Sequence, residues 1–267
     1  MQPIQPMAQC EEAAVAREGS VMVRLLPTNE IEDGDAALAA RLAGDEAARA
    51  SKFHHAADRK AYVGAHALLR TLLSQAMPGE APPRGWRFAE GPRGKPHLDP
   101  AQVRDVRFNL SHCRGMVAVA IAQGAEVGVD VEAIERHDFD EDAIAASHFC
   151  AAERARLARI ADAASRKHAF LALWTAKEAL IKALGDGLSM PLDGFCADLE
   201  RGTYVRYDAP HRDGEWSLAR WQRPGYLVAL AAPAGRRVEC REMRWDASAS
   251  VFVEGGALAP LPCGEPG

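Results

Sequence analysis

Apolar residues recur at intervals of three and four along two long stretches of the chain, residues 58–75 and 166–184. In the first stretch the recurring residues are Ala61, Ala65, Leu68, Leu69 and Leu72. In the second they are Phe170, Leu173, Ala176, Leu180, Ile181 and Leu184. Such spacing predicts two long helices that each bury an apolar face. Gly185 stands where a glycine commonly follows a helix, so the second helix should end there.

Short apolar runs separated by turns rich in Pro and Gly predict β-strands around these helices. Before the second helix the runs are residues 21–26, 86–88, 108–110, 116–122 and 127–131; after it they are residues 195–199, 204–207, 216–221, 227–232 and 238–245. The later group is expected to form antiparallel strands. Shorter helical stretches at 46–53 and 151–160 complete the pattern. The chain therefore predicts an α+β fold whose two halves meet near residues 123–127, although no repeat is visible in the sequence.

Composition and charge exclude several classes of function. A chain of 267 residues that is 48% hydrophobic can bury its own core. Its net charge of −5, from 32 basic and 37 acidic side chains mixed along the sequence, offers no basic field for nucleic acid. No apolar run approaches the ~20 residues of a spanning helix, and the first residues lack the pattern of a secretion signal, so we expect no membrane insertion. The six cysteines contain no CxxC pair and suggest neither a zinc knuckle nor a regular disulfide framework, so reduced thiols in a cytosol are expected.

Two carboxylates stand two residues apart at the end of a predicted strand. Because side chains alternate along a strand, Asp130 and Glu132 should project from the same face. Val127, Val129 and Val131 would point to the opposite, buried face. Acids crowded at the edge of a core favour a cation between them, and ligands that are all oxygen favour Mg²⁺ or Mn²⁺ over zinc. The alternative is the polar face of an ordinary strand.

A third carboxylate lies on the second long helix. Trp174, Glu178 and Lys182 are spaced by four and therefore stack on one helical face. Because the other faces are mostly apolar, Glu178 should lie at the border of a core. Glu178 and Lys182 could form an ordinary surface salt bridge. The sharper alternative is that Glu178 completes a magnesium site with Asp130 and Glu132.

The run FNLSH at residues 108–112 ends a predicted strand in a hydroxyl and an imidazole, directly before the turn-like residues 113–115. Backbone N–H groups in such a turn suit a phosphate oxygen. His112 could equally be a structural histidine. A nucleophilic pair of Ser111 and His112 is disfavoured, because neighbours on a strand point apart and the chain has no GxSxG elbow. Upstream, Lys95 lies in a predicted rigid turn before Pro96, as a further phosphate contact or as a solvated charge.

Four segments, taken in order, resemble the successive signatures of Sfp-type 4'-phosphopantetheinyl transferases. They are Gly-Lys-Pro at 94–96, FNLSH at 108–112, GVDVE at 128–132 and WTAKEALIKALGDGLS at 174–189. Residues 53–70 are also similar to the first helix of that family, so the resemblance covers most of residues 51–189. Each motif is weak alone, and their order carries the likeness.

The resemblance implies an α+β pseudo-dimer of two similar α+β subdomains, each an antiparallel sheet packed on a long helix, with the active site in the cleft between them. We expect an N-terminal subdomain at residues 21–125 and a C-terminal subdomain carrying the metal site at residues 126–250. Residues 1–20 are expected to be a disordered tail and residues 251–267 a flexible one. Because one chain would supply both halves, the resemblance implies a monomer.

The resemblance also implies roles for individual residues. The positions that hold Mg²⁺ against the pyrophosphate of coenzyme A correspond to Asp130, Glu132 and Glu178. The positions implied for binding coenzyme A, with its phosphates, are Lys52, Arg59, Lys95, Pro96, Ser111, His112 and Lys182. The catalytic positions are Glu178 as the base, with Lys182 and His112 offsetting charge on the pyrophosphate and on the departing 3',5'-ADP.

The implied activity is cytoplasmic transfer of 4'-phosphopantetheine from coenzyme A, the co-substrate, to a serine of an apo acyl or peptidyl carrier protein, with Mg²⁺ or Mn²⁺. The carrier is left open among those of fatty-acid, polyketide and nonribosomal-peptide synthesis. One alternative is a non-catalytic coenzyme A-binding relative, against which the intact set of three carboxylates argues. Another is a magnesium-dependent nucleotide phosphohydrolase, against which the context of FNLSH and WTAKE argues.

Overall fold

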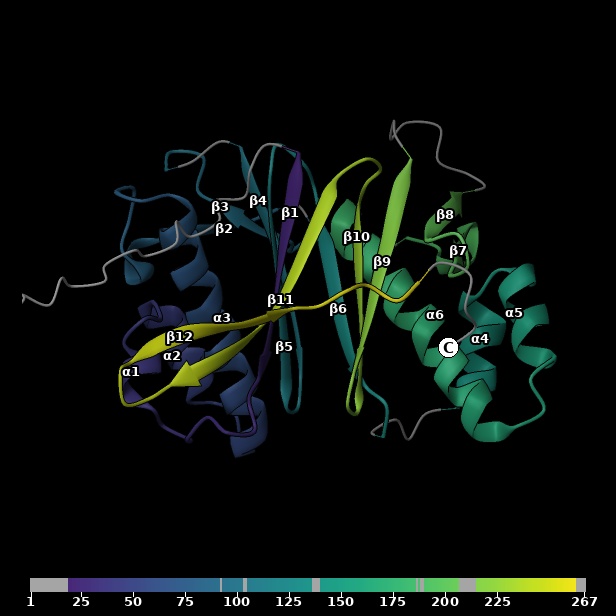
Figure 1. Ribbon diagram of the computed structural model, residues 1–267, viewed down its shortest axis with the longest axis horizontal. Helices are drawn as coiled ribbons and strands as arrows, with labels where there is room; N and C mark the ends of the chain where they lie inside the picture. Colours follow the sequence, from purple (N-terminus) through teal and green to yellow (C-terminus); the bar gives the residue numbers. More distant parts are fainter. Residues whose placement is uncertain are drawn as a thin grey trace, which may run out of the picture.

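The computed structural model describes residues 19–91, 93–102, 105–135, 140–185, 187, 190–206 and 215–262. Two β-sheets pack face to face at the centre of the molecule, and each carries helices on its outer face (Figure 1). The layers therefore run helix, sheet, sheet, helix. The expected α+β fold with two similar subdomains is confirmed.

The first sheet has the strand order β12-β11-β1-β5-β4. Its strands are β1 (Ser20–Pro27), β4 (Val106–Cys113), β5 (Met116–Gln123), β11 (Arg237–Asp246) and β12 (Val251–Ala257). Its outer face is covered by the long helix α3 (Ala56–Ala76), with α1 (Ala36–Ala39) and α2 (Gly44–Ala50) beside it. A short helical turn at Pro83–Gly85 leads into a small hairpin of β2 (Phe88–Glu90) and β3 (Pro96–Leu98).

The second sheet has the order β6-β10-β9-β8-β7. Its strands are β6 (Gly128–Ala133), β7 (Phe195–Asp198), β8 (Thr203–Arg206), β9 (Trp216–Arg223) and β10 (Tyr226–Pro233). The long helix α6 (Ala163–Leu184) packs on its outer face, with α4 (Glu141–His148) and α5 (Ala151–Ala158) further out (Figure 1). A short helical turn at Leu192–Gly194 precedes β7. Gly185 ends α6 in the left-handed conformation at φ 72°, as the sequence predicts.

Strand alternation sorts the apolar residues into separate cores. In β1, Val21 and Val23 face the second sheet, whereas Met22 and Leu26 pack toward α3. The same alternation places Val127, directly before β6, and Val129 and Val131 of β6 between the two sheets. The polar residues Asp130 and Glu132 consequently lie on the face of β6 that is turned toward α6.

The C-terminal part of the chain departs from the expected subdomain boundaries. β11 returns to the first sheet and pairs with β1 in parallel, so the expectation that all the later strands are antiparallel is wrong. Residues 251–257 form β12 against β11, which contradicts a flexible tail over that range. The buried Arg24 explains this anchoring, because its guanidinium pairs with Glu239 of β11 and Glu254 of β12. The expected tail at residues 1–20 lies almost wholly outside the described residues.

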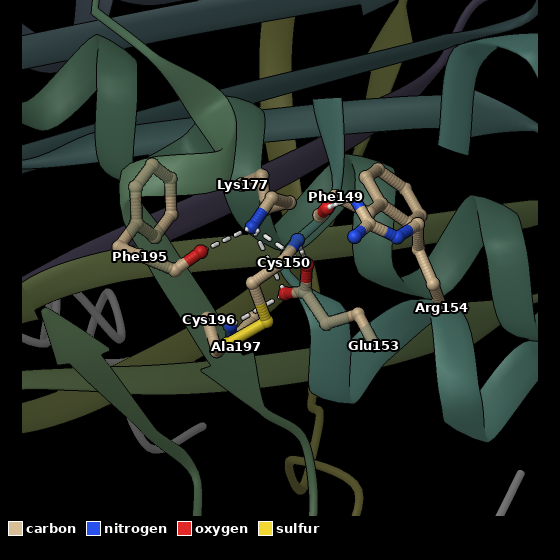
Figure 2. Close-up of a disulfide and its surroundings, with 8 residues drawn as sticks. All are labelled: Phe149, Cys150, Glu153, Arg154, Lys177, Phe195, Cys196 and Ala197. Atoms are coloured by element: carbon tan, nitrogen blue, oxygen red, sulfur yellow. Dashed lines mark hydrogen bonds and ion pairs between the residues drawn. A yellow bond between two sulfur atoms is a disulfide. The ribbon is translucent and has the colours of Figure 1, made fainter. Parts of the chain in front are cut away.

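The sequence predicts reduced thiols and no membrane insertion. Cys150 and Cys196 form a disulfide with their Cα atoms 5.8 Å apart, so the expectation of wholly reduced thiols is wrong (Figure 2). Cysteines 46 residues apart carry no spacing signal that would pair them. Among the described residues, no helix is both long enough and apolar enough to cross a membrane.

Candidate functional site

The site lies where edge strands of the two sheets meet beneath α6. β4 is the edge of the first sheet and β6 the edge of the second. The Asn109 side-chain oxygen of β4 accepts a hydrogen bond from the Val129 N–H of β6 at 2.8 Å, which joins the two edges. α6 approaches β6 so closely that a Cβ at Gly128 would lie 2.0 Å from the Ala179 carbonyl oxygen. Glycine at position 128 therefore sets the distance between the strand and the helix that carries Glu178 and Lys182.

Three side chains from these three elements form one hydrogen-bonded network. The Lys182 ammonium donates to Asp130 Oδ1 at 2.5 Å and to the Ser111 hydroxyl oxygen at 3.0 Å. The Ser111 hydroxyl in turn donates to Asp130 Oδ1 at 2.9 Å. The Asp130 and Ser111 residues are buried, whereas the Lys182 side chain keeps 29% of its surface exposed. Residues from the FNLSH, GVDVE and WTAKEALIK segments thus meet at one point.

The carboxylates of this network carry unused oxygen atoms. Among the described residues, Asp130 Oδ2 and Glu178 Oε1 are buried and have no hydrogen-bond partner. A buried acceptor without a partner costs stability, so such atoms indicate a place for a ligand. Glu132, which the Trp174 indole N–H reaches, completes the acidic set.

Burial and mutual repulsion shift the ionisation of the acidic residues. Burial, followed by the charge of Asp130, raises the pKa of Glu132 to about 7. The same two causes raise the pKa of Glu178. Burial lowers the pKa of Lys182, but the charge and hydrogen bond of Asp130 and the charges of Glu178 and Glu132 outweigh it, so the pKa is raised. Lys182 is therefore held as a cation among carboxylates that repel one another.

The donor set of Asp130, Glu132 and Glu178 fits a hard divalent cation, because it consists of carboxylate oxygens and two of these oxygens are buried and unpartnered. The oxygens are not gathered tightly: no choice of one oxygen from each residue brings all three within 4.8 Å of one another. Lys182 occupies Asp130 Oδ1. In this arrangement the Lys182 ammonium balances part of the negative charge of the three carboxylates, and a metal ion could balance the same charge.

His112 lies on the opposite face of β4 from Ser111. Its ring meets the ring of Tyr62 on α3 edge to face, with 6.2 Å between centroids. Burial, with added repulsion from His66 and Lys182, lowers the pKa of His112 to about 4. The imidazole is therefore uncharged at neutral pH. A role as a cation that offsets phosphate charge does not fit this surrounding, whereas a role as a neutral hydrogen-bond donor does.

The structure gives Lys95 a set of partners of its own. Its ammonium donates to Glu126 Oε2 at 2.7 Å and to the carbonyl oxygens of Ala183 at 2.9 Å and Val127 at 3.2 Å. These contacts tie the turn before β3 to the start of β6 and the end of α6. Pro96 begins β3 and pairs with Glu90. The expected phosphate contact of Lys95 gains no support from this arrangement, which is that of a structural lysine.

The two remaining expected phosphate contacts lie apart from the network. Arg59 forms an ion pair with Asp33 and donates to the Phe53 carbonyl oxygen at 2.6 Å. Lys52 is exposed in the turn between α2 and α3. No described contact joins either residue to Ser111, Asp130 or Lys182.

Several residues that hold the site in place were given no role from the sequence. Arg114 forms a two-pronged ion pair with Asp58 of α3, at 2.5 and 2.9 Å. The Tyr226 hydroxyl donates to the Arg114 carbonyl oxygen at 3.2 Å, and Gly115, at φ 93°, leaves room for that hydroxyl. Asn109 belongs to the FNLSH run and could have been suspected there. Tyr226 carries no local signal, because its contact spans 112 residues.

Comparisons with known proteins agree with this geometry. A model of the 4'-phosphopantetheinyl transferase superfamily matches residues 126–231, and a model described as the N-terminal part of 4'-phosphopantetheinyl transferases matches residues 32–124. The chain is 34% identical to the 4'-phosphopantetheinyl transferase psf-1 of Bacillus pumilus, over 70% of this chain and 76% of the relative. It is 32% identical to the 4'-phosphopantetheinyl transferase HetI of Nostoc sp., over 61% of this chain and 66% of the relative.

A solved structure, the holo-[acyl-carrier-protein] synthase of Thermotoga maritima, aligns with 46% of this chain and 71% of that one. At 18% identity and a TM-score of 0.29, this likeness is too loose to carry weight.

Proposed function

Because the chain belongs to the 4'-phosphopantetheinyl transferase superfamily, we propose that it transfers the 4'-phosphopantetheine group of coenzyme A to a serine of a carrier protein. The products are a holo-carrier and 3',5'-ADP. The observation that supports this most directly is the junction of β4, β6 and α6, where Ser111, Asp130 and Lys182 share one hydrogen-bonded network. Both family models contribute to that junction, since Ser111 falls in one and Asp130 and Lys182 in the other.

Asp130, Glu132 and Glu178 would hold Mg²⁺, or Mn²⁺ in its place. The fit rests on the buried, unpartnered oxygens of Asp130 and Glu178. When bound, the metal ion would supply charge that stabilises the pyrophosphate oxygens of coenzyme A as the bond to the leaving group breaks. A bound divalent cation would also offset the repulsion among these carboxylates, which adds to the effect of burial in raising the pKa of Glu132 and Glu178.

Lys182 would serve the pyrophosphate directly. Its ammonium is held charged by the surrounding carboxylates and is the partly exposed member of the network. Neutralisation of Asp130 by another cation would free that ammonium to donate to a phosphate oxygen. Positioning and electrostatic stabilisation carry most phosphoryl transfers, so the protein needs no covalent nucleophile of its own. The buried Ser111 accordingly acts here as a positioning hydroxyl and phosphate contact.

The attacking carrier serine must lose a proton, and Glu178 is the candidate base. Burial and the charge of Asp130 raise its pKa, which makes its carboxylate a better proton acceptor than a solvated glutamate. His112, uncharged at neutral pH, would donate a hydrogen bond to a phosphate oxygen. Arg59 and Lys52 remain proposed contacts to more distant phosphate oxygens, and Lys95 is assigned to holding the subdomains together.

We further propose that the protein acts as a cytoplasmic monomer. The two sheets, each with its own long helix, come from one chain and meet at the proposed site, so no second subunit is needed to complete it.

The experiment that tests the proposed function uses the purified protein, coenzyme A, Mg²⁺ and a panel of apo carrier proteins. Intact-mass spectrometry should show the carrier gaining one phosphopantetheine group, with 3',5'-ADP as the second product. A carrier in which the acceptor serine is replaced by alanine is the control and should gain no mass. Absence of transfer to every fatty-acid, polyketide and peptide carrier, with metal and coenzyme A both bound, would contradict the proposal.

A further inference from the structure

A second buried cluster lies in the C-terminal subdomain and includes the disulfide (Figure 2). Cys150 is the residue before α5, and Cys196 lies in β7. Both residues are buried, with 5% and 7% of their surface exposed. The bond therefore joins a helix start to a strand inside the protein.

An ion pair lies against this disulfide. The Lys177 ammonium donates to Glu153 Oε1 at 2.9 Å and to the Phe195 carbonyl oxygen at 2.6 Å, and it lies 2.8 Å from Glu153 Oε2. Lys177 is fully buried and Glu153 is 3% exposed. Such a pair is stable only while its hydrogen bonds are kept, because either charge alone would be buried without compensation.

Glu153 connects the ion pair to both cysteines. Its carboxylate accepts the Cys150 N–H at 2.9 Å and the Ala197 N–H, next to Cys196, at 2.8 Å (Figure 2). The carboxylate that fixes Lys177 is thus itself fixed by the two chain segments that the disulfide joins. Lys177 directly precedes Glu178 on α6, so the backbone that positions Glu178 is anchored here.

Cys150, Glu153 and Cys196 offer ligand atoms within 4.8 Å of one another, so a metal site is the alternative interpretation of this cluster. The Lys177 ammonium argues against a cation at this place. Both oxygens of Glu153 also already accept hydrogen bonds from Lys177 or the backbone. What remains is the chemistry of the two sulfur atoms.

We propose that Cys150 and Cys196 form a reversible redox site that controls the geometry of Glu178. The step is thiol–disulfide exchange with a dithiol reductant. One thiolate of the reductant attacks a sulfur of the Cys150–Cys196 bond, that bond breaks, and the second thiol of the reductant releases the mixed disulfide. Two electrons and two protons pass to the cysteines, which become thiols, while the reductant becomes a disulfide.

Reduction removes the covalent link between α5 and β7. The two N–H groups that hold Glu153, those of Cys150 and Ala197, then belong to segments that can move apart. Lys177 would move with the Glu153 carboxylate to which it is paired. Changes made along such packed contacts typically alter the coupling between two sites by about twofold to thirtyfold in affinity. The oxidised protein is therefore expected to bind the divalent cation more tightly than the reduced protein by a factor in that range.

The test equilibrates the full-length protein in dithiothreitol buffers of graded reduction potential. Alkylation followed by mass spectrometry gives the fraction of the disulfide at each potential. Three properties are measured beside it: hydrogen exchange of the amides of residues 174–182, Mn²⁺ affinity by electron paramagnetic resonance, and transfer rate. The double variant Cys150→Ala, Cys196→Ala represents the reduced state. Cys240→Ala, which changes a buried thiol in the first sheet, is the matched control.

As the disulfide forms, we expect hydrogen exchange in residues 174–182 to slow and Mn²⁺ affinity to rise. Both changes should have the same midpoint potential as disulfide formation. Cys240→Ala should respond like the wild type, and the double variant should not respond. The proposal is overturned if no Cys150–Cys196 bond forms in oxidising buffers. It is also overturned if the bond forms while hydrogen exchange of these amides stays unchanged. Both outcomes are measured on the wild type, so they hold even if the double variant fails to fold. The expected changes in Mn²⁺ affinity and in transfer rate rest on the proposed function, whereas the expected change in hydrogen exchange does not. If exchange switches while no carrier is modified at any potential, the redox site stands and the proposed function fails.

Discussion

Lys95, Lys177 and Lys182 show how neighbouring groups decide what a lysine ammonium does. Lys177, which pairs with Glu153, has its pKa lowered by burial despite the opposing effects of Glu153 and the more distant Asp193. Lys182, with three carboxylates near it, has its pKa raised although burial opposes this. Lys95 donates to two backbone carbonyl oxygens in addition to Glu126. Only Lys182 combines a surplus of negative neighbours with an exposed edge, and it is therefore the lysine suited to meet an anionic substrate.

Replacing Lys182 by methionine should destabilise the metal-free protein and make Mg²⁺ restore much of the loss. Without the ammonium, Asp130, Glu132 and Glu178 repel each other uncompensated, and breaking a buried pair costs of order 3 kcal/mol. Melting temperatures with and without Mg²⁺ provide the measurement. Lys52→Met, at an exposed position, is the control and should change neither curve. If Mg²⁺ raised the melting temperature of Lys182→Met no more than that of the wild type, the shared charge balance would be refuted.

His112 should make the folded protein less stable as the pH falls from about 6.5 to about 4. The folded-state pKa of about 4 lies below the ordinary value of 6.5, so in this window the unfolded chain binds a proton that the folded protein excludes. Above pH 6.5 the imidazole is neutral in both states and contributes no such loss. Urea unfolding of the wild type and of His112→Asn over this range isolates the effect. The free energy of unfolding of the wild type should fall relative to that of His112→Asn as the pH falls. A constant difference would contradict the lowered pKa of His112 in the folded protein.

At the scale of secondary structure, the strand and helix periodicities predicted the faces that form the site. The two-residue spacing of Asp130 and Glu132 and the four-residue spacing of Glu178 and Lys182 place both sets toward the same junction, as expected. Partners distant in the sequence could not be predicted. The parallel pairing of β11 with β1 depends on a crossover spanning most of the chain, and the Cys150–Cys196 bond depends on how α5 and β7 pack. Local patterns fix the face of an element but not its neighbour.

The packing of α6 on β6 should not tolerate a methyl group at position 128. In Gly128→Ala the new Cβ would lie 2.0 Å from the Ala179 carbonyl oxygen and 2.3 Å from the Ala183 backbone nitrogen, so the helix must move. Overpacking of this kind costs about 1–3 kcal/mol or more, and the shift would also displace Glu178 and Lys182 from Asp130. The melting temperature and the transfer rate should both fall.

Gly44→Ala is the matched control for that change, because a Cβ at Gly44 has no atom within 4 Å. It should leave both properties nearly unchanged. A Gly128→Ala protein as stable and as active as the Gly44→Ala protein would show that the close approach of α6 to β6 does not position Glu178 and Lys182 for activity.

For the whole molecule, two sheets of the same size, each with one long helix, place the site at their shared edge. The last strands of the chain return to the first sheet, so β11 and β12 tie the end of the sequence to its beginning. The two subdomains are therefore connected by the chain twice, through residues 124–127 and again through the segment between β10 and β11. Such a connection favours a site that stays assembled within one chain.

The active species is expected to be a monomer. Size-exclusion chromatography with light scattering, with transfer measured across the eluted fractions, should place the activity at the mass of one 28.8 kDa chain. Serial dilution should leave the activity per molecule constant. Activity confined to a larger species, or lost on dilution, would mean that the site needs a second copy.

The central claim is that the carboxylate set around Asp130 carries out metal-dependent phosphopantetheine transfer, and Asp130→Asn tests it most directly. Asparagine keeps an oxygen that Lys182 can reach but removes the charge that a divalent cation requires. Transfer to an apo carrier at saturating Mg²⁺ should fall by roughly a hundredfold or more, since loss of a metal ligand removes several kcal/mol of transition-state stabilisation. Asp142→Asn, at an exposed position of α4, should transfer at the wild-type rate. An Asp130→Asn protein that folds normally and transfers as fast as Asp142→Asn would contradict the account.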